Sequence, residues 1–217
     1  AIEPAAVGVP VDLDAVNDLA STLEGHPDNA SASVYGGATI SWVDALAPEG
    51  EQVHSAAIPV HPGIEPLVLV PQIQLATATA RAVLPAQVPH REAALNSASA
   101  GLLVLALSSR PDLLTAGTRE WLHQEQRRSS FGGAMEIVDA LRAQGHAAVI
   151  SGAGPSVLVL ARTDVPTDAT GGRTVPEQVA GLLPPGWALL RPGIPRRGLR
   201  IERVTVEELP DVLAYSA

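Results

Sequence analysis

The chain has 217 residues and a formal net charge of −9, and its hydrophobic fraction of 46% is enough to build a core. This acidic balance, with no run of cations, argues against a nucleic-acid partner. All 14 cations are arginine, so a lysine-dependent phosphate loop and Schiff-base catalysis are excluded within this chain. The absence of cysteine also excludes disulfides and thiolate chemistry.

No segment has the pattern of a membrane anchor or an export signal. The longest apolar run, GLLVLAL at 101–107, is far shorter than the ~20 residues of a membrane-spanning helix. The first ten residues lack the basic start and hydrophobic stretch of a signal peptide. Together with the absence of cysteine, these features predict a cytoplasmic protein with no membrane partner.

The first elements in chain order are two helices and a strand. A helix is predicted over 12–24, because apolar residues recur at helical spacing between an aspartate cap and Gly25. Pro27 is typical of a first helical turn and begins a second helix, which the glycine pair at 36–37 ends. Residues 38–43 have strand character.

The stretch 47–66 is rich in proline and glycine, and we place a domain boundary within it, giving domains at 1–62 and 63–217. The second domain is predicted to hold strands at 67–70, 146–151, 155–161 and 198–208, helices at 75–85, 90–109, 113–128 and 132–145, and a loop-rich segment at 163–185. This mixture of strands and helices predicts an α+β sandwich.

The segment EGHPDN at 24–29 concentrates polar chemistry. Glu24 lies at the end of a helix, where a carboxylate is unfavourable beside the helix dipole, and this suggests a compensating cation. One interpretation of Asp28 and Asn29 is a capped helix start. The other is that two acids near a helix start hold Mg²⁺ and orient an alcohol for phosphoryl transfer.

The loop SGAG at 151–154 lies between two predicted strands. It lacks the third glycine and the following helix of a dinucleotide-binding fingerprint. Two interpretations stay open, a tight strand connection that needs glycine and a loop whose backbone amides face an anion.

Arginines offer a means of holding a carboxylate. Thr77 and Arg81 are four apart and share one face of a predicted helix. An arginine fork there would bind a carboxylate, with the hydroxyl as a second anchor. A solvated side chain is the alternative for Arg81, and a solvated pair is the alternative for Arg127 and Arg128.

In this order, the motifs at 24–37, 77–96, 122–127 and 151–156 resemble those of the homoserine kinases, a family of the GHMP small-molecule kinases. The resemblance implies phosphorylation of L-homoserine to O-phospho-L-homoserine by Mg-ATP, in threonine biosynthesis. It also implies a remnant of the N-terminal ATP-binding domain at 1–62 and a ferredoxin-like domain at 63–217, and it allows a homodimer.

The resemblance assigns roles to nine residues. It implies that Glu24 ligates the Mg²⁺ of Mg-ATP, and that His26, Asp28 and Asn29 contact the amino and hydroxyl groups of homoserine. Of the latter we favour an orienting role for Asp28 over that of a base. Further along the chain it implies that Thr77, Arg81 and Arg127 hold the substrate and its carboxylate, and that Gly152 and Gly154 shape the pocket floor.

The chain departs from the family pattern at its start. Family members carry a glycine- and serine-rich phosphate loop upstream of the first helix, and this chain has no such loop, so we expect little or no kinase activity from it alone. Ser99 and Gln126 also replace a family arginine and tyrosine. The alternatives are a GHMP kinase for another small alcohol and a non-catalytic ferredoxin-like module that binds an amino acid.

Overall fold

The computed structural model describes residues 11–46, 52–72, 83–131, 133–165 and 171–200. The chain forms two compact units, one made of 1–57 with 195–217 and the other of 58–194. Helices and antiparallel strands are mixed along the chain, which confirms the expected α+β class. None of the described helices is both long enough and apolar enough to span a membrane.

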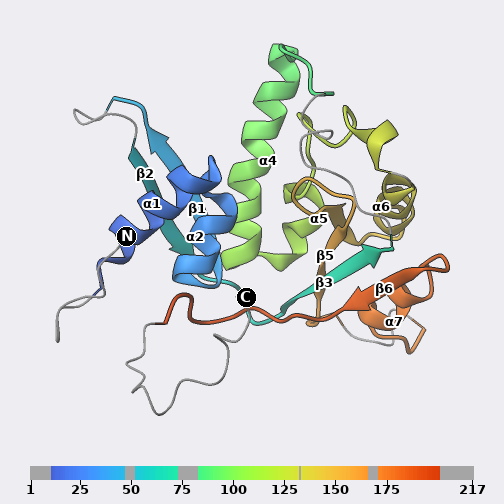
Figure 1. Ribbon diagram of the computed structural model, residues 1–217. Coiled ribbons are helices and arrows are strands. Elements are labelled where there is room, and N and C mark those ends of the chain that lie inside the picture. Colours follow the sequence, from blue (N-terminus) through green and yellow to red (C-terminus); the bar gives the residue numbers. More distant parts are fainter. Residues whose placement is uncertain (1–10, 47–51, 73–82, 132, 166–170, 201–217) are drawn as a thin grey trace, which may run out of the picture. The chain divides into compact units, whose positions relative to one another are not determined.

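The first unit begins with two helices, α1 (Leu13–Glu24) and α2 (Pro27–Tyr35), followed by a two-stranded sheet of β1 (Ala38–Asp44) and β2 (Gln52–Ile58) (Figure 1). The carboxylate of Asp12 accepts the first free amides of α1, from Asp14 at 3.0 Å and Ala15 at 3.1 Å. Gly25 ends the helix in the left-handed region, at φ 81°. Both predicted helices are thereby confirmed.

The described end of the chain returns to this first unit. Gly37 donates its N–H to the carbonyl of Pro195 at 2.7 Å, and Leu199 donates to Val34 at 3.0 Å. A Cβ atom at Gly198 would lie 2.2 Å from the carbonyl oxygen of Val34, so only glycine allows this approach. The sequence predicts one domain over 63–217, whereas these hydrogen bonds tie residues 195–199 to the end of α2.

The second unit contains a four-stranded antiparallel sheet in the order β4-β5-β3-β6. Its strands are β3 (Ile64–Pro71), β4 (Ala147–Ile150), β5 (Val157–Arg162) and β6 (Trp187–Leu190). The register sets Leu67 of β3 opposite Val159 of β5. Burial alternates along β5 because successive side chains point to opposite faces.

Two apolar clusters surround this sheet. The first joins Leu67 and Val159 to Leu141 of α6 (Ala134–Ala143) and to Phe131. In the second, Leu160 packs with residues of α4 (His90–Ser108), of the 3₁₀-helix η1 (Pro111–Leu113) and of α5 (Leu114–Gly117). Neighbouring residues of β5 thus contribute to different clusters, which places packed layers on both faces of the sheet.

Some elements differ from prediction. The predicted helix at 113–128 is replaced by η1, the single turn of α5, further turns, and the 3₁₀-helix η2 (Arg128–Ser130). Strand β2 occupies part of the predicted loop at 47–66, and the loop-rich segment 163–185 contains α7 (Val175–Ala180). Most of the predicted helix at 75–85 and most of the strand at 198–208 fall outside the described residues.

Candidate functional site

The turn between α1 and α2 brings four predicted residues into one short segment. Glu24 is the last residue of α1, Gly25 reverses the chain, and His26 follows in an extended conformation as the N-cap of α2. Pro27 then occupies the first helical turn, where its fixed φ favours the helix. The side chains of Glu24, Asp28 and Asn29 are all exposed beside this turn.

His26 and Asp28 interact directly. The Nδ1 atom of His26 contacts Oδ1 of Asp28, and the same oxygen accepts the backbone N–H of Asn29 at 2.9 Å. The side chain of Asp28 is 71% exposed, and its second oxygen has no hydrogen bond to any described residue. No side chain caps α2. The bond from Asn29 and the position of Pro27 agree with part of the capped-helix interpretation, although the N-cap side chain itself makes no capping bond. The second carboxylate oxygen of Asp28 has no hydrogen bond to a described residue and can accept one from a ligand.

Beneath this turn, a chain of small polar side chains joins all four elements of the first unit. Ser31 of α2 donates to the carbonyl of Pro27, and its hydroxyl lies 2.7 Å from that of Ser41 in β1. Ser41 lies 2.7 Å from Ser55 of β2, which accepts from the amide of Asn17 in α1 at 3.2 Å. These bonds hold the first turn of α2, and with it the polar segment, against the sheet. The sequence did not identify them; their only signal was the small size of the residues in α2.

The carboxylate of Glu24 is the predicted Mg²⁺ ligand. Among the described residues, no group of three or more histidine, aspartate or glutamate side chains is arranged to hold a metal ion. Mg²⁺ is, however, commonly held by one or two carboxylates, with waters and substrate phosphates completing its coordination. A single exposed carboxylate therefore fits a magnesium ion that arrives with a nucleotide and does not form a site of its own.

In the second unit, Arg127 is a buried cation. It is only 8% exposed, its Nε atom has no hydrogen-bond partner, and it forms no ion pair with any described residue. An unpaired buried charge is costly, so such a group is normally matched by a ligand or a counter-ion. The interpretation of Arg127 as a solvated residue does not agree with this burial.

Its neighbour Arg128 behaves differently. Arg128 is more exposed and donates to Glu125 at 2.6 Å and to Asp139 at 2.9 Å. These two carboxylates hold the pKa of the Arg128 guanidinium well above its ordinary value. The solvated, ion-paired interpretation therefore fits Arg128, and the two arginines have separate roles.

The SGAG loop is a tight connection between β4 and β5. Ser151 donates its N–H to Ser156 at 2.8 Å, and Gly154 donates to Ser151 at 3.0 Å. Gly152 and Gly154 have φ values of 57° and 78°, which other residues rarely adopt. A Cβ atom at Gly154 would also lie 2.6 Å from the ring of Phe131. This confirms the strand-connection interpretation of the loop.

Arg127 and this hairpin lie at the same end of the sheet. Gln124 accepts the N–H of Ile150, the last residue of β4, at 2.7 Å. Phe131, four residues after Arg127, packs against Gly154. The segment that carries Arg127 is thus attached to the hairpin on both sides of the arginine, which brings Arg127, Gly152 and Gly154 together in one region.

Glu120 shapes the segment before Arg127. Its carboxylate accepts the backbone N–H groups of Leu122, His123 and Gln124, each at 2.8 Å for the shortest contact. Burial acts to raise the pKa of Glu120, but the backbone donors, that of Gln124 foremost, outweigh it and leave the pKa below its ordinary value. Asn96 of α4 adds a bond to the N–H of Trp121 at 3.1 Å. No sequence motif marked Glu120, and the motif at 77–96 contains Asn96 without predicting this contact.

Two predicted site residues, Thr77 and Arg81, lie outside the described residues. The polar segment 24–29 belongs to the first unit, whereas Arg127, Gly152 and Gly154 belong to the second.

Comparison with known proteins gives a consistent result. Residues 103–169 match the family model described as GHMP kinases C terminal. The chain is 39% identical over 202 residues to a homoserine kinase of Clavibacter michiganensis, covering 93% of this chain and 61% of that protein. It is 47% identical over 163 residues to a homoserine kinase of Mycolicibacterium smegmatis, covering 74% of this chain and 51% of that protein. The chain thus spans only half to three fifths of these relatives.

Solved structures show the same fold. A homoserine kinase from Cytophaga hutchinsonii matches 80% of this chain and 53% of its own, with a TM-score of 0.59 at 20% identity. A putative homoserine kinase from Listeria monocytogenes matches 90% of this chain and 62% of its own, with a TM-score of 0.55 at 22% identity. At these identities the likeness concerns the fold alone.

Proposed function

We propose, from the premise that this chain is a homologue of the GHMP kinases, that it is part of a homoserine kinase. The reaction is transfer of the terminal phosphoryl group of Mg-ATP to the hydroxyl of L-homoserine, giving O-phospho-L-homoserine and ADP for threonine biosynthesis. The observation that carries the proposal in the structure is Arg127, a buried guanidinium with no partner among the described residues.

Arg127 recognises the acidic end of the substrate. A guanidinium binds a carboxylate through two parallel N–H bonds, and burial strengthens the pairing by excluding water. The hairpin glycines Gly152 and Gly154 carry no side chain, and in this proposal they form the floor of the pocket. Thr77 and Arg81 add further anchors in this proposal. An alcohol without a carboxylate would leave the charge of Arg127 unmatched, which favours an amino acid over other small alcohols.

The polar turn of the first unit carries groups suited to the acceptor hydroxyl and to Mg²⁺. Phosphoryl transfer depends mainly on positioning and on neutralising charge, so the acceptor hydroxyl must be held in line with the phosphate. The free oxygen of Asp28 accepts the hydrogen bond of that hydroxyl, while His26 fixes the orientation of the carboxylate. Asn29 contributes a side-chain amide to the amino-acid end of the substrate. Glu24 holds Mg²⁺, which supplies charge neutralisation at the phosphates.

Binding of L-homoserine to the 217-residue chain tests this proposal by calorimetry. We expect Arg127→Gln to weaken binding at least thirtyfold, because a charge-assisted bidentate pair is lost. The matched control Arg128→Gln, which removes the neighbouring exposed arginine, should change the affinity less than threefold. L-homoserine amide, which lacks the carboxylate, should bind the wild-type chain as weakly as homoserine binds Arg127→Gln. Equal affinities of the two arginine variants would refute the proposal.

The kinase activity itself depends on phosphate binding. Because the chain spans 61% of its Clavibacter relative and carries no glycine- and serine-rich phosphate loop, we expect the 217 residues alone to turn over homoserine slowly or not at all. A coupled assay for ADP release checks this. Rapid turnover would show that another segment binds the phosphates.

A second candidate function is that of a non-catalytic module that binds an amino acid. This function needs only Arg127 and its surroundings. It predicts homoserine binding that Mg-ATP does not affect. The kinase hypothesis predicts that Mg-ATP changes the affinity for homoserine. This is measured on a longer protein that also contains the part of the relatives' sequence that the 217 residues do not cover. That change should disappear in Glu24→Gln, because the proposed Mg²⁺ ligand is removed.

A further inference from the structure

The two-stranded sheet of the first unit carries polar side chains at the centre of its covered face. The hydroxyl of Ser41 in β1 lies 2.7 Å from that of Ser31 in α2. Ser55 of β2 accepts from the amide of Asn17 in α1 at 3.2 Å. Both helices therefore lie on the face that carries these serines. A sheet that packs helices on one face normally buries apolar residues there and exposes polar ones on the other.

The opposite face of this sheet is apolar and exposed. Because successive side chains of a strand alternate between faces, Ile40 and Trp42 of β1 point away from the helices, as do His54 and Ala56 of β2. The rings of Trp42 and His54 stack with their centroids 5.5 Å apart, which confirms that they share one face. Ile40 is 46% and Trp42 51% exposed, and His54 and Ala56 are exposed as well. These four residues form the outer face, and large exposed apolar side chains that adjoin one another are typical of a contact surface.

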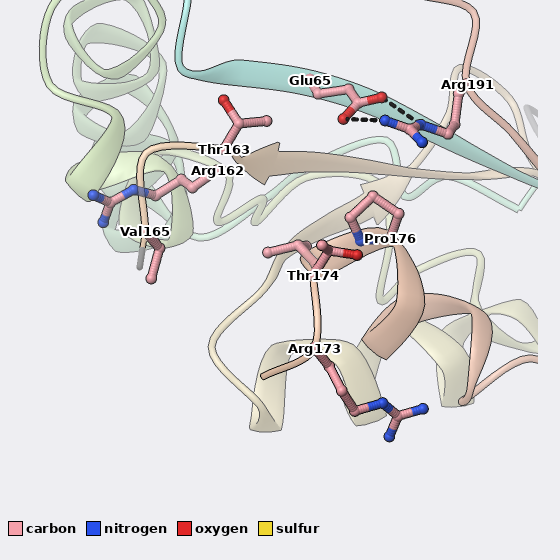
Figure 2. A pocket seen from close by; sticks show the side chains of 9 residues that line it. Glu65, Arg162, Thr163, Val165, Arg173, Thr174, Pro176 and Arg191 are labelled. Atoms are coloured by element: carbon pink, nitrogen blue, oxygen red, sulfur yellow. Dashed lines mark hydrogen bonds and ion pairs between the residues drawn. The ribbon is translucent and has the colours of Figure 1, made fainter. Parts of the chain in front are cut away.

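The chain that leaves the second unit is led to the start of this sheet. Arg191, directly after β6, pairs with Glu65 of β3 at 2.6 Å, and Figure 2 shows the pair at the wall of a cavity. Four residues further on, the carbonyl of Pro195 accepts the N–H of Gly37, the residue directly before β1. The last described part of the chain is therefore fixed beside the first residue of β1.

The rest of the chain is long enough to reach the outer face. Leu199 donates to Val34 of α2, and the described chain ends one residue later, at Arg200. The terminal segment 201–217 follows. At about 3.3 Å for each extended residue, Trp42 lies about 17 Å along the strand from Gly37, whereas the terminal segment can span about 56 Å. A part of this segment is sufficient to pass the helices and lie on the outer face.

The composition of the terminal segment suits an apolar surface. Nine of its 17 residues are apolar, a larger share than the 46% of the whole chain. Such a segment is not typical of a solvated terminus, which is usually poor in apolar residues. The strand predicted over 198–208 would place Val204 and Val206 on one side and Thr205 on the other.

We propose that the outer face of β1 and β2 is the docking surface for the chain's own terminal segment, 201–217. Val204 and Val206 cover Ile40 and Trp42, and this contact removes apolar surface of both partners from water. The first unit then has helices on one face of its sheet and the terminal segment on the other. This inference is independent of the kinase proposal, because no residue of the outer face belongs to the candidate site.

Paramagnetic broadening in nuclear magnetic resonance spectra of the full 217-residue chain tests the proposal. Because the chain has no cysteine, Thr205→Cys accepts a single spin label on the side of the predicted strand that faces away from the valines. The label at position 205 should broaden the indole N–H signal of Trp42 and the amide signal of Ala56. The amide of Thr22, exposed on α1 on the helical side of the unit, should be broadened much less.

Glu3→Cys, labelled in the same way, is the matched control from the other end of the chain. Broadening of Trp42 by the label at position 3, without broadening by the label at position 205, would assign the face to residues 1–10 and overturn the proposal. A mixture of labelled chain and isotope-enriched unlabelled chain identifies a second copy as the occupant. Broadening of Trp42 in that mixture as strong as within one chain would overturn the proposal too, and so would equal broadening of Thr22 and Trp42.

A substitution in the terminal segment separates docking from mere attachment near the sheet. Val206→Asp, made in the chain labelled at position 205, should abolish the broadening at Trp42, because a carboxylate is not buried against an indole ring without a partner. Ser216→Asp adds the same charge nearer the end of the segment and should preserve the broadening. Unchanged amide signals of α1 and of the β4–β5 hairpin show that both variants are folded. Broadening that persists in Val206→Asp would show that the segment is close to the sheet without packing on it, and would overturn the inference.

Discussion

Arg127 and Arg128 are adjacent in the sequence and have opposite surroundings. Arg128 pairs with two carboxylates near the surface, whereas Arg127 is buried without a partner among the described residues. Composition and spacing do not distinguish two neighbouring arginines, because burial depends on which segments pack against them. The structure shows that Arg127, the arginine that the resemblance singles out, is the buried one of the two.

The unpaired charge of Arg127 predicts a gain in stability on its removal. Replacing it with methionine, which has a similar length and no charge, should raise the free energy of unfolding of the ligand-free chain by about 1–3 kcal/mol. Urea denaturation measures this change. The same variant should lose homoserine binding. A destabilised Arg127→Met chain would instead indicate that the arginine supports the fold through contacts outside the described residues.

Glu120 predicts a dependence of stability on pH. Because its pKa is lowered in the folded chain, its stabilising contribution is fully present above the unfolded value of about 4.3 and is lost as the pH falls through the folded pKa. Glu120→Gln should therefore be less stable than wild type at pH 7, and the difference should shrink as the pH is lowered towards 3.

Urea denaturation at several pH values checks this prediction. Glu125→Gln is the control, because the carboxylate of Glu125 pairs only with Arg128 and accepts no backbone N–H from a described residue. A stability difference for Glu120→Gln that stays constant from pH 7 to pH 3 would contradict the assigned role of the carboxylate.

Among the elements, the SGAG hairpin offers two glycines with similar dihedral angles and different surroundings. A methyl group at Gly154 would meet the ring of Phe131, whereas one at Gly152 would meet nothing within 4 Å. Gly152→Ala should therefore cost only the strain of a left-handed residue, about 1–2 kcal/mol. Gly154→Ala should cost more, and Phe131→Leu added to it should recover part of the loss. Equal costs at the two positions, measured by urea denaturation, would contradict the close packing of the loop.

The elements that were predicted correctly from the sequence are those whose structure is determined by their own residues. Helices α1 and α6 follow apolar periodicity, and α1 also has a clear cap and stop. The predicted helix at 113–128 fails because the side chain of Glu120 accepts backbone N–H groups that a helix would use, and a turn forms instead. Strand β6 depends on pairing with β3, which no local pattern predicts.

In the candidate site, too, the features set by neighbouring residues were predicted and the contacts between distant segments were not. The sequence identified the turn at 24–29, because its polar residues are consecutive and the turn residues Gly25 and Pro27 are unambiguous. It also identified the hairpin glycines. The serine chain beneath the turn and the contacts of Gln124 and Asn96 were not predicted, since they join segments distant in the sequence.

At the scale of the whole molecule, the first unit depends on both parts of the chain. Gly198→Ala should destabilise that unit, because the added methyl group would overlap the carbonyl of Val34. Amide hydrogen exchange should then accelerate at Gly37 and Leu199, while the four-stranded sheet of the second unit stays protected. Gly101→Ala in α4 is the control, since a methyl group there meets no neighbour within 4 Å and the backbone is helical. Loss of protection in both units together would show that they unfold as one.

The bonds from Pro195 and Leu199 to the segment 34–37 also have a consequence for biosynthesis. A ribosome releases the helices of the first unit early. The segment 195–199, which completes their packing, is translated only after the entire second unit. The middle of the polypeptide can therefore reach its native state before the beginning does. Translation arrest after residue 194 should leave a nascent chain whose central unit resists protease while its opening helices are cleaved.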